Sequence, residues 1–303
     1  SMMLIKFYAL VIGFVVLFFT WVNVAAQTTT KDAFRMKFET RVHDIVKDFD
    51  GVIGLSLKDL TTGESLSVNG DVVFTQASTI KLQILVELLK QVNEGRFSLD
   101  DSITMTESDL TVGSGVLRYL SPDAVIMTVR DVATLMIIAS DNTATNIMID
   151  MVGMENVNRT MRELGFTETK LQRKMMDTLA WKEGRENLST PHEVTSLLAM
   201  IYEAEILDRG SCEELLRILS IPKGGAIRTR LPEDVRIAHK TGGVGGVQVD
   251  AGIVYLENKS FVIAVMTNWI DNSENAREVM SEISLVTYNY FNRLSQSNEY
   301  GHR

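Results

Sequence analysis

The amino-acid sequence predicts an α/β fold of the α+β type, in which an antiparallel sheet flanked by helices lies beside an all-helical lobe. Strand-like alternation of apolar and polar residues occurs before residue 78 and again after residue 235. Residues 78–200 between them carry mainly the apolar spacing of helices. The simplest packing of this order joins both ends of the chain in one sheet and leaves the helical middle as a second lobe. A cleft between the two lobes is the expected place for a site.

The first part of the sheet lobe follows from residues 31–68. Apolar side chains at three- and four-residue steps predict an amphipathic helix over Lys31–Phe49. Alternation predicts a strand over Val52–Leu57, and turn residues at 61–64 lead into a second strand over Ser65–Val68. The first helix is therefore expected to cover the sheet, and the next two segments are expected to be strands of it.

The late part of the chain returns to the sheet. Three more strands are expected, over Arg236–Lys240, Val247–Leu256 and Ser260–Asn268, followed by an amphipathic helix over residues 273–294. We therefore expect a sheet lobe formed by about residues 31–75 and 225–295, and a helical lobe formed by about residues 76–220.

The N-terminus has the order of a secretory signal. Lys6 precedes an apolar run over residues 7–22, and small residues follow up to Ala26. We expect a signal peptide over residues 1–26 with cleavage after Ala26, which predicts a secreted or periplasmic protein. The alternative is an uncleaved membrane anchor, for which the apolar run is short.

Composition argues against several classes of function. The formal net charge is −9 and the basic residues are scattered, so no stripe exists to bind nucleic acid. Cys212 is the only cysteine, which excludes an intrachain disulfide and indicates a buried structural thiol. Neither His192 nor His239 has Cys or His neighbours at metal-ligand spacing. We expect no metal, no cofactor, and a monomer that acts on a small molecule.

Ser78 and Lys81 form the first motif, Ser-x-x-Lys, at the start of an apolar helical pattern. Residues three apart on a helix share a face, so the Lys81 amine can approach the Ser78 hydroxyl. A lysine whose pKa is lowered by burial and neighbouring charge can take the serine proton and create a nucleophile. Taken alone, the motif also fits a serine helix cap followed by a surface lysine.

Ser140, Asp141 and Asn142 form the second motif, directly after an apolar helix. Ser140 could pass a proton to a leaving nitrogen, and Asn142 could hold a substrate amide. The alternative is a helix-capping turn, which accounts well for Asp141.

Lys240, Thr241 and Gly242 form the third motif, on the strand that begins at Arg236. Lys240 would supply positive charge for a carboxylate, and Thr241 a hydroxyl. Gly242 and the following Gly243 would let a substrate lie close to the strand. The alternative is an edge strand that leads into a glycine-rich turn.

In this order, the three motifs resemble the set found in class A β-lactamases and penicillin-binding proteins. Residues 188–191, Leu231-Pro232 and Asp250 also fit the family pattern. The resemblance covers nearly the whole of residues 27–303 and implies one catalytic domain. Its implied fold is a five-stranded antiparallel sheet with helices on both faces, beside a helical lobe.

The resemblance also implies roles for the motif residues. Ser78 is the implied nucleophile, and Lys81 and Ser140 relay protons. The backbone N–H groups of Ser78 and Gly243 form the implied oxyanion hole.

The remaining implied roles concern substrate binding. Asn142 would bind the substrate amide, and Lys240 and Thr241 would bind its carboxylate. Arg228 falls near a position where some relatives keep an additional carboxylate-binding arginine.

One departure from the family pattern affects deacylation, the step in which water cleaves the acyl-enzyme. The family carries a Glu-x-x-Leu-Asn run in its omega loop, and this Glu activates the water that cleaves the acyl-enzyme. Aligned on Leu171 and Arg173, the Glu position is Met175 and the Asn position is Leu179. A thioether cannot act as a base, so Asp177 is the candidate carboxylate for this step.

Three functions therefore remain open. The first is a β-lactamase, with slow deacylation because the omega-loop Glu is replaced by Met175. The second is a D-Ala-D-Ala carboxypeptidase, or another peptidase or esterase with the same acylation machinery. The third is a protein that binds or senses a β-lactam without turnover.

Overall fold

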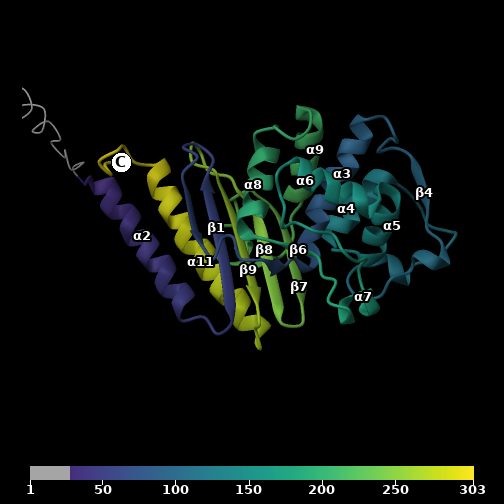
Figure 1. The fold of residues 1–303 in the computed structure, drawn as a ribbon. Coiled ribbons are helices and arrows are strands. Elements are labelled where there is room, and N and C mark those ends of the chain that lie inside the picture. Colours follow the sequence, from purple (N-terminus) through teal and green to yellow (C-terminus); the bar gives the residue numbers. More distant parts are fainter. Residues whose placement is uncertain (1–27) are drawn as a thin grey trace, which may run out of the picture.

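A five-stranded antiparallel sheet forms the centre of one lobe in the computed structural model, which describes residues 28–303 (Figure 1). The strands are β1 (Val52–Asp59), β2 (Ser65–Val68), β7 (Ile237–Val244), β8 (Val247–Val254) and β9 (Phe261–Asn268). Their spatial order is β2-β1-β9-β8-β7, and β1 pairs with β9 along its whole length. The expectation that both ends of the chain share one sheet is confirmed. The predicted signal peptide lies outside the described residues.

Helices cover both faces of this sheet. The helices α2 (Thr30–Lys47) and α11 (Ser273–Ser295) pack together on one face, and α8 (Pro191–Tyr202) packs on the other (Figure 1). Because both faces are covered, seven successive residues of β9, 261–267, are buried. The rings of Phe38 and Tyr290 stack at 4.2 Å between the two outer helices.

The second lobe is helical and surrounds one buried helix, α3 (Lys81–Asn93). Residues 81–89 of α3 are buried on every side, as expected for a helix that is central to its lobe. The helices α4 (Val129–Ile138), α5 (Asn142–Val152), α6 (Met154–Glu163) and α9 (Arg209–Ser220) pack on it. The other elements of this part of the chain are α7 (Thr178–Lys182) and the short strands β3 (Phe74–Thr75), β4 (Ser102–Thr104), β5 (Ile126–Thr128) and β6 (Leu188–Ser189).

The edge strand β7 meets this lobe through a short 3₁₀ turn, η1 (Ala77–Ile80), which precedes α3. Strand β7 is longer than predicted, because Thr241 to Val244 still pair with β8. The third motif therefore lies inside the strand rather than at its exit. Within residues 28–303, no helix is long and apolar enough to cross a membrane.

Candidate active site

Ser78 lies in η1, where the backbone packs tightly against β7. A Cβ atom added to Gly242 would lie 2.7 Å from the carbonyl oxygen of Gln76 and 2.9 Å from the backbone nitrogen of Ser78. Only glycine permits this approach. The backbone N–H of Ser78 is consequently held beside the strand that carries Gly243.

Lys81 is fully buried, and its amine donates to three oxygens. These are the carbonyl of Ser140 at 2.7 Å, the hydroxyl of Ser140 at 3.0 Å and Oδ1 of Asn142 at 3.1 Å. Burial, and then the charge of Lys240, lower the pKa of Lys81 well below its usual value. A buried amine of lowered pKa is suited to take a proton. The Ser78 hydroxyl is not among the hydrogen-bond partners of Lys81.

Ser140 joins two lysines because of its backbone conformation. It lies between α4 and α5 with φ at +49°, a left-handed conformation that costs a non-glycine residue roughly 1–3 kcal/mol. This conformation presents both its carbonyl and its hydroxyl to Lys81. The same hydroxyl accepts a hydrogen bond from Lys240 at 3.2 Å. Such local strain is typical of functional sites.

Lys240 is also buried, and its amine donates to the carbonyl of Thr241 at 2.7 Å. Burial, and then the charge of Lys223, lower the pKa of Lys240 to about 7. Burial likewise lowers the pKa of Lys223 to about 8. Lys223 is a cation that the motifs did not indicate, since it lies 17 residues before Lys240 in an irregular segment.

Behind the third motif, His239 and Asp250 form a buried pair with Nδ1 and Oδ1 2.9 Å apart. His239 thus lies on the strand face opposite Lys240, as the alternation predicts. Asp250 also accepts from the backbone N–H of Ile227 at 3.0 Å. This pair fixes β7 and β8 against the segment that precedes them.

Asp141 holds the loop that borders the site. Its buried carboxylate accepts from the backbone N–H groups of Val116 at 2.6 Å, Leu117 at 2.9 Å and Ala144 at 3.0 Å. A Cβ atom on Gly115, whose φ is +107°, would lie 2.2 Å from that carboxylate. The predicted capping role of Asp141 is confirmed, and the anchoring of residues 115–117 is additional.

Asn142 is held between Lys81 and the same loop. Its Oδ1 accepts from Lys81, while its Nδ2 donates to the carbonyl of Val112 at 3.0 Å. Gly113 leaves room for this amide, because a Cβ atom there would lie 2.5 Å from Nδ2. The amide orientation is therefore fixed by its neighbours.

Met175 is buried in the core of the helical lobe, with 8% of its surface exposed. Its backbone is clamped by Asn146, whose side chain accepts from the Met175 N–H at 2.8 Å and donates to its carbonyl at 3.2 Å. A salt bridge of 3.0 Å between Arg173 and Glu186 closes the ends of this loop. The position expected for a base is thus apolar and firmly held.

Asp177 lies at the start of α7. Its carboxylate is exposed and caps α7, with Oδ1 accepting from the N–H of Ala180 at 2.9 Å. Within residues 28–303, the side chain of Asp177 forms no hydrogen bond with Ser78, Lys81 or Ser140. The carboxylate of Asp177 thus serves as a helix cap, and its role as water-activating base stays a prediction.

Arg228 also bonds to local backbone groups. Its guanidinium group donates to the backbone carbonyls of Pro232, at 2.7 Å, and Val235. These bonds stabilise the turn before β7 and use two of the five N–H donors of the group. The predicted contact of Arg228 with a substrate carboxylate stays a prediction. Within residues 28–303, no group of three or more His, Cys, Asp or Glu side chains is placed to hold a metal ion.

Residues 37–291 match the family described as the β-lactamase enzyme family. The chain belongs to this family. Among curated relatives, β-lactamase VEB-1 of Pseudomonas aeruginosa is 24% identical over 290 residues, which cover 91% of this chain and 95% of that protein. β-Lactamase AER-1 of Aeromonas hydrophila is 30% identical over 198 residues, 64% of each chain.

Solved structures of the β-lactamase family agree in fold. PBP-A superposes with a TM-score of 0.77 at 33% identity, over 84% of this chain and 96% of that one. A class A β-lactamase from Bacteroides cellulosilyticus DSM 14838 has a TM-score of 0.77 at 25% identity, over 86% of this chain and 98% of that one. The expected five-stranded β-lactamase fold and the resemblance to class A are thereby confirmed.

Proposed function

We propose that the protein is a serine hydrolase in which Ser78 is acylated by a β-lactam carbonyl and the acyl-enzyme is hydrolysed slowly. The observation that carries this proposal is the Ser140 hydroxyl, which accepts from Lys81 and Lys240 next to the η1 turn that holds Ser78. A buried base, a proton donor and a second cation thus lie together, as acyl transfer requires.

In the first step, neutral Lys81 takes the proton from the Ser78 hydroxyl. The serine oxygen bonds to the carbonyl carbon, and the resulting oxyanion accepts from the backbone N–H groups of Ser78 and Gly243. The C–N bond of the ring then breaks. Its nitrogen receives the Ser140 proton, and Lys81 returns the proton it took from Ser78 to Ser140.

Substrate binding uses the remaining motif residues. In its charged form, Lys240 attracts the carboxylate of the substrate, and Thr241 donates its hydroxyl to the same group. Asn142 offers an amide whose orientation is fixed by Lys81 and Val112. We infer that the substrate lies along the edge of β7, because Gly243 carries no side chain there and Gly242 lets η1, with Ser78, pack close to the strand.

Slow deacylation follows from the apolar position of Met175. Its thioether cannot remove a proton from water, and the nearby loop carboxylates are engaged elsewhere, Asp177 as a cap and Glu186 with Arg173. A variant of PBP-A, whose parent structure is 33% identical to this chain, has been solved as an acyl-enzyme complex with penicillin G. This relative supports acylation by a penicillin.

A second candidate is a D-Ala-D-Ala carboxypeptidase. Such an enzyme uses the same acylation machinery, and Met175 favours it because these peptidases lack the deacylating Glu of the lactamases. For both candidates we infer that the protein is exported and that its N-terminal segment is removed near Ala26. We also infer that the remaining domain acts as a monomer on a small molecule.

A chromogenic cephalosporin tests the proposal. We expect a burst of one equivalent per Ser78, followed by slow turnover, and no burst in Ser78→Ala. A burst without any later turnover would indicate the binding or sensing function instead. Release of D-alanine from a peptide ending in D-Ala-D-Ala, faster than cephalosporin turnover, would favour the carboxypeptidase.

A further inference from the structure

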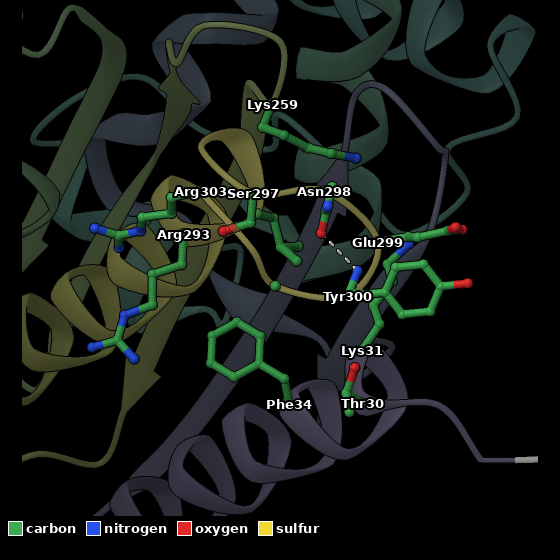
Figure 2. A pocket seen from close by; sticks show the side chains of 12 residues that line it. Thr30, Lys31, Phe34, Lys259, Arg293, Ser297, Asn298, Glu299, Tyr300 and Arg303 are labelled. Atoms are coloured by element: carbon green, nitrogen blue, oxygen red, sulfur yellow. Dashed lines mark hydrogen bonds between the residues drawn. The ribbon is translucent and has the colours of Figure 1, made fainter.

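A cavity of about 450 Å³ lies where the start of α2 meets the end of α11 and the residues that follow it (Figure 2). Figure 1 places this end of the two helices on the outer side of the sheet lobe, away from the helical lobe. Phe34, Leu294 and Tyr300 supply apolar and aromatic walls. A volume of this size is typical of small-molecule sites.

The wall formed by residues 297–303 is an ordered loop built around Asn298. Its Oδ1 accepts from the backbone N–H groups of Tyr300 and His302, each at 3.0 Å. The backbone N–H of Asn298 in turn donates to the carbonyl of His302 at 3.0 Å. The cavity is therefore formed before any ligand arrives, which lowers the entropic cost of binding.

Positive charge collects around this cavity although the whole chain carries a net charge of −9. Lys31, Arg293 and Arg303 line it, and within residues 28–303 none of them forms a salt bridge. The lining residue Lys259 differs, since it pairs with Asp59 at 2.9 Å. In Figure 2 the guanidinium groups of Arg293 and Arg303 lie on the same side of the view, opposite Tyr300 and Glu299.

We propose that this cavity binds an amphiphilic anion, with its carboxylate or phosphate on Arg293 and Arg303 and its apolar body against Phe34 and Tyr300. Arginine pairs with such anions through two parallel hydrogen bonds, which favours them over neutral ligands. Among the lining side chains, Glu299 is the one acidic group, against three cations without a salt bridge within residues 28–303. The site is separate from Ser78 and does not depend on the function proposed there.

Octyl phosphate is a suitable probe, measured by isothermal titration calorimetry below its micelle concentration. We expect it to bind at least about tenfold more tightly than octanol, which lacks the charge, and than inorganic phosphate, which lacks the apolar chain. Added salt should weaken its binding, because part of the attraction is between charges.

Two variants locate the site. Arg293→Gln and Arg303→Gln should each weaken binding by about tenfold, the value of one charge-assisted hydrogen bond. Arg209→Gln on α9 makes the same change of charge at an exposed position outside the cavity and should leave binding unchanged. Thermal unfolding of all three variants checks that each remains folded.

Three results would overturn the proposal. The first is equal affinity for octyl phosphate, octanol and inorganic phosphate. The second is equal weakening by Arg209→Gln and by the two cavity variants. The third is sedimentation of the protein with phosphatidylglycerol vesicles without any binding of monomeric octyl phosphate. This result would show that the basic residues bind a membrane surface rather than a single amphiphile.

Discussion

The amine of Lys81 lies 3.0 Å from the hydroxyl oxygen of Ser140, and the amine of Lys240 lies 3.2 Å from that same oxygen. Both lysines are buried, and burial is the first cause of the lowered pKa of each. One hydroxyl thus connects the proposed base for Ser78 with the proposed cation for the substrate. From this arrangement we predict how the rate of acylation of Ser78 responds to pH and to substitution.

The rate of acylation should have a bell-shaped dependence on pH. It should rise as Lys81 loses its proton and becomes a base, and fall as Lys240 loses its proton at about pH 7 and no longer attracts a carboxylate. Stopped-flow measurement of kcat/KM with a chromogenic cephalosporin would follow both limbs. Lys240→Arg keeps its charge and should move the upper limb to higher pH. A rate that does not change through about pH 7 would contradict this assignment.

Replacing Met175 by Glu should raise the rate of deacylation. The introduced carboxyl would be nearly buried, since Met175 is 8% exposed, and burial raises the pKa of a carboxyl toward that of a useful base. We expect the burst to persist and the later rate to increase about a hundredfold or more. Met175→Gln is the matched control, because it adds polarity without a base. Equal rates after the burst in the two variants would exclude this position as the site of water activation.

Asp177→Asn should leave both the burst and the later steady rate unchanged. Asp177 is exposed and caps α7, and asparagine caps a helix about as well as aspartate. Asp177→Ala should remove the cap and lower the free energy of unfolding by about 1 kcal/mol. A steady rate that falls tenfold in Asp177→Asn would return this carboxylate to the mechanism.

Asp141→Ala should destabilise the folded protein by at least about 3 kcal/mol. The change leaves three backbone N–H groups without their acceptor, and each unsatisfied buried group costs about 1–3 kcal/mol. Urea unfolding measures the difference. Asp131→Ala removes the exposed N3 carboxylate from the capping box of α4, whose N-cap is Thr128, and should cost about 1 kcal/mol. Similar losses in the two variants would show that Asp141 does not anchor the loop at 115–117.

The sequence predicted the strands of the sheet well, although burial alternates only in β2; β1, β8 and β9 are buried on both faces over most of their length. It also indicated Ser78, Lys81, Ser140 and Lys240, through three motifs in a fixed order. The structure then places the last three in one hydrogen-bonded group.

The sequence pattern did not predict side-chain directions or the conformation of irregular backbone segments. Nothing in the pattern required φ of +49° at Ser140 or the clamp of Asn146 on Met175. Asp177 was chosen as a carboxylate of the loop and Arg228 by its place in the family pattern, and each side chain bonds to local backbone groups. Lys223 was missed because its effect on Lys240 depends on how an irregular segment folds against β7.

Intact-mass spectrometry of the protein after incubation with penicillin G tests the acylation of Ser78 most directly. We expect a species heavier by one molecule of penicillin G, which persists because deacylation is slow, and fragmentation that assigns the adduct to Ser78. Ser78→Ala should show no such species. Absence of any adduct on the unmodified chain, or an equal adduct on Ser78→Ala, would contradict the proposed acyl-enzyme.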